Sequence, residues 1–160
     1  MVDRCRSWPL ALIALALGTM TSAKALDRLE LEAVKCSMER NGSEVPCHRL
    51  VFRQSDDHAL RIRIMGSSTA TAGEIRLTFV SREATNSAAL HCNNQSCRLK
   101  ETIWTGRVNS GSWIAFDQRG LPENPSNAEL MTGECQISKK QVICDGQTTD
   151  GDVLHAEARL

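Results

Sequence analysis

The cysteine and histidine side chains are the first groups in this sequence that could bind a metal ion. Six cysteines and four histidines follow residue 25: Cys36, Cys47, Cys92, Cys97, Cys135, Cys144, His48, His58, His91 and His155. A zinc site needs thiolates in ligand spacing, such as two residues between paired cysteines with a second pair downstream. The successive cysteine pairs here enclose ten, four and eight residues. This spacing predicts disulfides and no metal site.

Residues 55–58 contain the side-chain types of a hydrolytic triad, in the order Ser55, Asp56, Asp57, His58. Adjacent residues cannot aim their side chains at one another as nucleophile, base and orienting group, so we interpret the segment as a solvent-facing turn. The Gly-x-Ser-x-Gly elbow, the His-Glu-x-x-His motif and the phosphate-binding glycine loop are all missing. We therefore predict no catalytic residue and no cofactor.

Two tryptophans and two arginines form the strongest candidate binding site in the sequence. Trp104 and Trp113 lie close together in a chain without tyrosine, and Arg107 and Arg119 flank them. They could form an aromatic platform for a ligand, and we predict these four side chains as binding residues. Large aromatic side chains in a small β domain are mostly buried. The alternative is therefore that one or both tryptophans fill the core.

The elements that position these residues are predicted to be β-strands. Leu29–Glu32, Leu60–Ile64 and Ile75–Phe79 alternate apolar and polar residues, which places every second side chain on the same face of a strand. Asn41-Gly42 and Asn109-Ser110-Gly111 are among the segments that predict turns. Many short strands of this kind predict a single all-β domain, an antiparallel sandwich or barrel.

The turn at Asn41-Gly42 predicts the disulfide pairing. Both residues tolerate the positive φ of a two-residue hairpin loop, which would place Cys36 opposite Cys47. The same reasoning places Cys135 opposite Cys144, and Cys92 and Cys97 enclose a four-residue polar loop. Directly opposed residues lie close enough to form a disulfide. We expect three local bridges, in sequential order.

The first 25 residues have the pattern of a cleaved signal peptide. Arg4 and Arg6 precede an uncharged apolar run, and Ala23-Lys24-Ala25 supplies small residues at a cleavage site. An uncleaved membrane anchor is the alternative, but the apolar run is shorter than the roughly 20 residues of a membrane span. We expect the domain to comprise residues 26–160, in the periplasm or secreted.

The charge of the expected domain is close to neutral. Cleavage of the expected signal peptide would remove three basic residues and one acidic residue. This leaves 16 basic and 18 acidic residues and a net charge of −2. This balance gives no electrostatic reason to expect nucleic acid or an anionic membrane as a partner. The partner we expect is another extracytoplasmic protein, and the oligomeric state stays open.

Two protein families share short patterns with the chain. Cys92–Cys97 followed by Trp104 and Trp113–Asp117 resembles the globular half of minor pseudopilins, although their prepilin leader and long N-terminal helix have no counterpart here. The order of a ten-residue and then a four-residue cysteine loop is similar to that of invasion-associated periplasmic proteins. The pair Cys135 and Cys144 departs from that pattern. Each resemblance covers less than half of the chain, so neither assigns a family.

The sequence thus predicts a non-enzymatic binding or inhibitor-like protein that acts through loops of a rigid β domain. Disulfide-locked hairpins lose little conformational freedom on binding, which favours a binding role. The first alternative is a structural or accessory component of a bacterial envelope or secretion assembly, where strand addition at a sheet edge is common. A small hydrolytic enzyme ranks third, because its motifs are missing.

Overall fold

Alternating sequence patterns give this chain an all-β fold in the computed structural model, which describes residues 28–67, 73–83, 87–93, 96–124 and 127–160. The predicted signal peptide, residues 1–25, lies outside the described residues. The strands are β1 (Arg28–Glu32), β2 (Lys35–Arg40), β3 (Ser43–Gln54), β4 (Leu60–Ser67), β5 (Glu74–Arg82), β6 (Leu90–Cys92), β7 (Cys97–Leu99), β8 (Trp104–Ala115), β9 (Glu129–Ile137), β10 (Gln141–Thr148) and β11 (Val153–Arg159).

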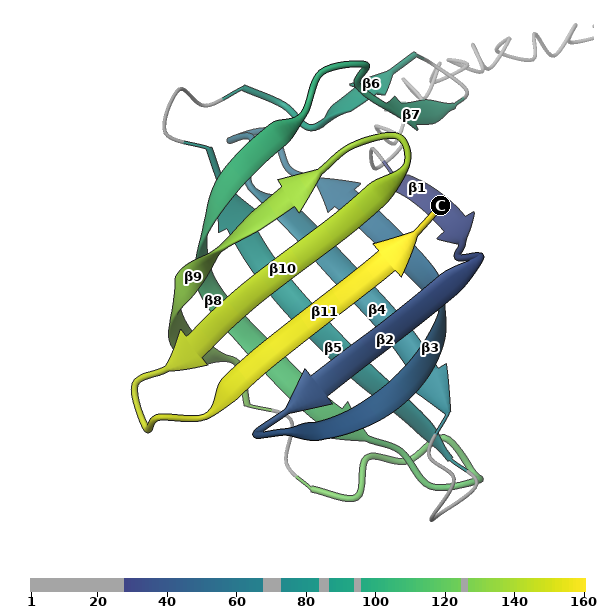
Figure 1. The fold of residues 1–160 in the computed structure, drawn as a ribbon, viewed down its shortest axis with the longest axis vertical. Helices are drawn as coiled ribbons and strands as arrows, with labels where there is room; N and C mark the ends of the chain where they lie inside the picture. The colour runs from purple at the N-terminus through teal and green to yellow at the C-terminus, as the bar shows by residue number, and fades with distance from the viewer. Residues whose placement is uncertain (1–27, 68–72, 84–86, 94–95, 125–126) are drawn as a thin grey trace, which may run out of the picture.

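The main sheet closes into an antiparallel barrel of eight strands (Figure 1). Its order is β2-β3-β4-β5-β8-β9-β10-β11, and β11 pairs with β2 to complete the ring. Each strand therefore lies beside its neighbour in sequence, apart from the β6–β7 hairpin inserted after β5. β1 is an additional strand that pairs with β3 beyond the end of β2. Of the two predicted architectures, the structure adopts the barrel.

Side chains fill the interior of the barrel. In β3, β4 and β5, for example, Phe52, Ile62 and Phe79 are completely buried, while the residues between the buried positions face outward. Cys135 and Cys144 lie directly opposite each other and are also completely buried. A barrel of eight strands is just wide enough for its side chains to fill it. The interior is thus a packed core.

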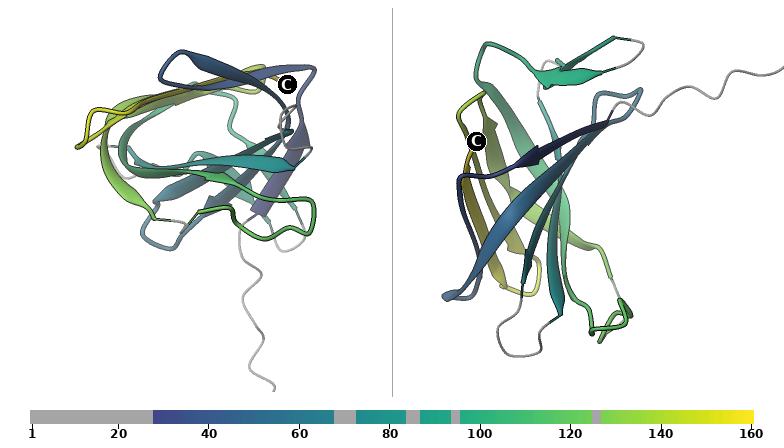
Figure 2. Two further views of the ribbon diagram at one scale, coloured as in Figure 1. Left: turned by 90° about the horizontal axis from the view of Figure 1, so that it is seen from below. Right: turned by 90° about the vertical axis from the view of Figure 1, so that its right-hand side faces the viewer.

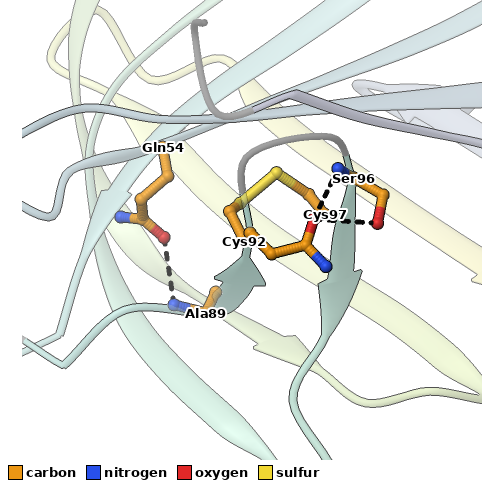
Figure 3. Close-up of a disulfide and its surroundings, with 6 residues drawn as sticks. Gln54, Ala89, Cys92, Ser96 and Cys97 are labelled. Atoms are coloured by element: carbon orange, nitrogen blue, oxygen red, sulfur yellow. Dashed lines mark hydrogen bonds between the residues drawn. A yellow bond between two sulfur atoms is a disulfide. The ribbon is translucent and has the colours of Figure 1, made fainter. Parts of the chain in front are cut away.

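The β6–β7 hairpin lies across one end of the barrel (Figures 1 and 2). Its apolar side chains, Leu90 and Leu99, are buried in the same core cluster as the barrel residues. Beside it, the Gln54 side chain accepts a hydrogen bond from Ala89 N–H at 3.0 Å (Figure 3). The hairpin is therefore an integral cap of the core. Its tip is closed by the Cys92–Cys97 disulfide.

The three predicted disulfides are confirmed, together with the strand registers behind two of them. Asn41 and Gly42 have φ values of 51° and 83°, as the predicted hairpin turn requires. The following register pairs Ser37 with Pro46, and the Cα atoms of Cys36 and Cys47 are 4.9 Å apart. The corresponding distances are 4.0 Å for Cys92–Cys97 and 4.1 Å for Cys135–Cys144. Three disulfides suggest an oxidising, extracytoplasmic environment.

One predicted turn is wrong. Residues 109–111 lie within the long strand β8, where the register with β9 shifts between Val108 and Ser110. Gly111 faces the interior, and a Cβ atom there would lie 2.8 Å from Met131 Cε. The small residues therefore accommodate an irregularity in a continuous strand and a close approach of β9, and the chain does not reverse.

Candidate functional site

The outer surface of β1, β3, β4 and β5 carries a cluster of arginines, which we call the arginine face. It consists of Arg28, Arg49, Arg53, Arg61, Arg63 and Arg76. In Figure 1, β4 and β5 lie behind β10 and β11, and β1 and β3 lie at the right-hand side of the barrel. The residues on either side of Arg61 and Arg63 are buried in the core. Because side chains in a strand alternate between its two faces, both guanidinium groups point outward.

Strand register brings three of these arginines into one row. Arg28 of β1 lies opposite Arg53 of β3, and Arg53 lies opposite Arg61 of β4 on its other side. Directly opposed residues have Cβ atoms about 5 Å apart, and like charges in such positions are destabilising. Arg63 follows Arg61 at the next outward position of β4. The face therefore concentrates positive charge in a chain with no net charge.

Glutamates neutralise the two ends of the arginine face. Glu30 lies between Arg28 and Arg49, with Oε2 2.6 Å from the first and Oε1 3.2 Å from the second. At the other end, Glu74 Oε1 accepts hydrogen bonds from Arg76 Nη2 at 2.6 Å and from Nε at 3.1 Å. Both glutamates are partly exposed, so each pair is accessible to water. Carboxylates are thus the anions already bound on this face.

The centre of the face has no such partner. Arg53, Arg61 and Arg63 form no ion pair with any acidic residue in the described part of the chain. The Nε atoms of Arg53 and Arg63 are shielded from solvent and lack a hydrogen-bond partner among the same residues. Burial lowers the pKa of the Arg63 guanidinium, and the surrounding arginines lower it further. These three side chains can therefore receive an external anion.

An aromatic ring borders the face beside Arg76. The guanidinium carbon of Arg76 lies 4.3 Å from the centroid of the Phe116 ring, which is a cation–π contact. Both side chains line a shallow open hollow of about 290 Å³ together with Glu74 and Asp117. A partner that covers the arginines has room here for an apolar or planar side chain.

The structure separates the four binding residues predicted from the sequence. Trp104 is 3% exposed and its Nε1 donates a hydrogen bond to Ser87 O at 3.0 Å, which fixes the ring in the core beneath the cap. Trp113 is half-buried and packs against the core from the opposite part of β8. The core alternative therefore describes Trp104, whereas Trp113 keeps an accessible surface.

The two predicted arginines are exposed and lie away from the core that the tryptophans contact. Arg107 is exposed on the outer face of β8, opposite Glu134 of β9. Arg119 lies in the exposed turn after β8, where its Nε donates to Asp117 Oδ2 at 2.9 Å. The four side chains thus form no common platform. Their role in binding stays a prediction that applies to each separately.

Sequence reasoning overlooked the arginine face, although part of its signal is visible. The alternation of Leu60 to Ile64 places Arg61 and Arg63 on one face of a strand, and this pattern was interpreted only as evidence for a strand. What the sequence does not contain is the register that sets Arg53 beside Arg61. Arginines from four strands therefore become one cluster only in the folded barrel.

Other kinds of site find no support in the described part of the chain. Its histidines, cysteines and acidic residues form no group of three that could bind a metal ion. The same residues include no helix long and apolar enough to cross a membrane. The Ser55–His58 segment is the turn between β3 and β4, where Asp57 accepts hydrogen bonds from Ser55 and Arg82.

Comparison with known proteins identifies no relative. No protein-family model, no curated protein and no solved structure matches the chain. Any functional conclusion must therefore come from the geometry described above.

Proposed function

We propose that this protein is an exported, non-enzymatic binding protein, inhibitor-like in presenting a rigid, preformed surface to another extracytoplasmic protein. The observation that carries the proposal is the group of guanidiniums at the centre of the arginine face that form no ion pair with any described residue. A cluster of like charges destabilises the free protein. A partner that neutralises the cluster would remove this repulsion, which supports a binding role for the face.

The construction of the barrel supports binding on its outside. Completely buried side chains such as Phe52 and Phe79 occupy the interior, and the cap covers one end. The wall itself is held by a continuous hydrogen-bonded sheet and by two disulfides that join neighbouring strands. A surface on such a frame needs little ordering when a partner binds, which lowers the entropic cost of association.

The disulfides and the expected signal peptide support the proposed compartment. Three disulfides are typical of proteins in oxidising environments. Together with the pattern in residues 1–25, they support export to the periplasm or secretion. A small domain in either place meets other envelope or secreted proteins, which is the partner class that we propose.

Affinity capture tests this function. The protein, expressed with its native N-terminus and tagged at the C-terminus, is purified in its oxidised form and used as bait in envelope extract and culture fluid. We expect one protein to be retained stoichiometrically at physiological ionic strength and identified by mass spectrometry. If that protein is an enzyme, its activity in the presence of the bait tests the inhibitor-like role. Absence of any retained protein from both sources contradicts the proposal.

A second candidate function is supported by the free edge of β1. Ala33 N–H donates to His48 O at 2.8 Å, so the alternating backbone groups of Arg28, Glu30 and Glu32 point away from β3. No described strand pairs with β1 on that side. Such an edge can accept an added strand, as expected of an accessory component in an envelope or secretion assembly.

The two candidates differ in their response to a proline at that edge. Glu30→Pro removes a free-edge N–H without removing a β1–β3 hydrogen bond, because this N–H points away from β3. Glu30→Gln is the matched control, since it keeps the N–H. Loss of a large complex with Glu30→Pro alone, measured by size-exclusion chromatography of envelope extract, favours the accessory role. Equal behaviour of the two variants excludes strand addition at β1.

A further inference from the structure

The centre of the arginine face, which has no ion-pair partner among the described residues, suggests which kind of partner surface it recognises. We infer that Arg53, Arg61 and Arg63 bind carboxylates of an acidic segment on the partner protein, an inference that rests on the proposed function. The three side chains come from adjacent strands of a braced sheet, so their spacing is set before the partner arrives. Guanidinium groups bind carboxylates through paired, charge-assisted hydrogen bonds.

The protein itself shows that this face binds carboxylates. Glu30 bridges Arg28 and Arg49 at one end, and Glu74 makes a two-nitrogen contact with Arg76 at the other. An acidic segment lying across the centre would continue the same pattern between these two ends. It would also supply carboxylates to Arg53, Arg61 and Arg63, which form no ion pair among the described residues.

The same surface is poorly suited to a lipid bilayer. Five large hydrophobic side chains of the described residues project into solvent, and none belongs to β3, β4 or β5: Val34, Ile103, Leu121, Leu130 and Val153. The apolar residues between the arginines, Val51 and Met65, are each only 5% exposed. Attachment to a membrane here would depend on charge alone, without the apolar insertion that strengthens interfacial binding.

A second copy of the chain is also a less suitable source of carboxylates. The outer wall formed by β9, β10 and β11 is acidic, but its carboxylates already accept hydrogen bonds from neighbouring side chains. The pairs are Glu134 with Gln136 at 3.1 Å, Asp145 with His155 at 2.6 Å and Glu157 with Gln141 at 2.9 Å. Pairing of one barrel with another through this wall would compete with these contacts. We therefore assign the acidic segment to another protein.

The first test measures binding of a short, fluorescently labelled oligoglutamate peptide by anisotropy at physiological ionic strength. We expect the double variant Arg61→Gln/Arg63→Gln to bind it at least tenfold more weakly than the unchanged protein. The control Arg98→Gln/Arg159→Gln removes the same charge from the cap and from β11, and it should bind the peptide normally. Equal weakening in both double variants, or no binding by the unchanged protein, overturns the inference.

Two further probes separate the possible sources of negative charge. Phosphatidylglycerol vesicles and a single-stranded oligonucleotide present phosphates in place of carboxylates. Tighter binding of either one than of the peptide, lost in Arg61→Gln/Arg63→Gln, overturns the inference in favour of a phosphate-bearing partner. A concentration-dependent dimer that the same variant abolishes, measured by analytical ultracentrifugation, overturns it in favour of a second copy.

Affinity capture with the same variant distinguishes failure of this inference from failure of the proposed function. If Arg61→Gln/Arg63→Gln retains the captured protein as well as the unchanged bait does, the binding function stands and the arginine face is not its site. If the unchanged bait captures nothing, the function itself fails, whatever the peptide does. Circular dichroism of each variant establishes that its barrel is folded.

Discussion

Arg53 lies directly opposite Arg61 across the antiparallel pairing of β3 and β4, with Arg28 opposite Arg53 on the other side. Three like charges in one row of a sheet oppose folding, because each cross-strand pair brings two guanidiniums together. The barrel tolerates this row because the completely buried Phe52 and Ile62 stabilise the same strands from within. Removal of the Arg61 charge should therefore stabilise the fold and weaken the proposed binding.

Replacing the central arginine of β4 should stabilise the free protein. We expect Arg61→Gln to increase the free energy of unfolding by about 0.2–1 kcal/mol at low ionic strength, because a like-charge pair is removed. The gain should shrink as salt screens the remaining charges. Thermal unfolding followed by circular dichroism at low and high salt measures both effects. Arg98→Gln, on the exposed side of the cap, should leave the melting temperature unchanged.

The hydrogen bond between Trp104 and Ser87 couples the barrel to the segment that leads into the cap. We expect Trp104→Phe to lower the free energy of unfolding by about 1–3 kcal/mol, because it leaves a carbonyl oxygen without its donor and reduces core volume. Trp113→Phe should cost less, since that ring is half-buried. Urea unfolding monitored by circular dichroism compares the variants, and an equal loss in both would contradict the core position assigned to Trp104.

Acid should weaken the junction between β2 and β11 through Asp152. Its Oδ1 accepts a hydrogen bond from Asn41 Nδ2 at 2.7 Å, and Oδ2 accepts one from Arg40 Nε at 3.1 Å. These contacts lower the pKa of Asp152 below its usual value, and the hydrogen bond from Asn41 has the largest effect. A carboxyl whose pKa is lower in the folded state stabilises the fold above the unfolded pKa of about 3.9. That contribution disappears as the pH falls through the folded pKa.

Asp152→Asn tests this linkage. The variant should unfold at a lower temperature than the unchanged protein at neutral pH, and the difference should vanish in strong acid, where both side chains are neutral. Thermal unfolding over a series of pH values provides the comparison. A difference that persists at the acid end would mean that shape, and not charge, determines the contribution of Asp152.

The three disulfides should differ in their resistance to reduction under native conditions. Cys135 and Cys144 are inaccessible inside the barrel, whereas Cys92 and Cys97 are partly exposed at the tip of the cap. A thiolate reductant must reach a sulfur atom, so we expect the cap bridge to open first and the interior bridge only on unfolding. Alkylation after mild reduction, followed by peptide mass spectrometry, gives the order. Early labelling of Cys135 would contradict it.

The sequence contains enough local information to predict the strands and the disulfides, and too little to predict the site. Alternation at Leu60–Ile64 and the turn at Asn41-Gly42 depend on neighbouring residues, so their structures follow from local patterns. The choice of a barrel over a sandwich depends on β11 pairing with β2, which no local pattern specifies. The row of arginines depends in the same way on register between strands.

The tryptophans illustrate a different limit. Trp104 and Trp113 both lie on β8, nine positions apart in the sequence. A simple alternating strand would direct residues separated by an odd number to opposite faces. The register shift between Val108 and Ser110 changes this phase, so Trp113, like Trp104, packs against the core cluster. The residues at the shift, Asn109-Ser110-Gly111, are also typical of a turn, and the sequence alone therefore left both positions open.

The pairing of β2 with β11 also determines the order in which the protein can fold. Arg40 and Asp152 meet across 112 positions of the chain, so the ring cannot close until almost all of its residues are available. Each disulfide, by contrast, spans 11 residues or fewer and can form within a single hairpin. Contacts distant in sequence form slowly, because the intervening chain must first lose its freedom. Oxidation of the hairpins should therefore precede closure of the barrel, which leaves an open, already cross-linked sheet as the species that chaperones and proteases encounter first.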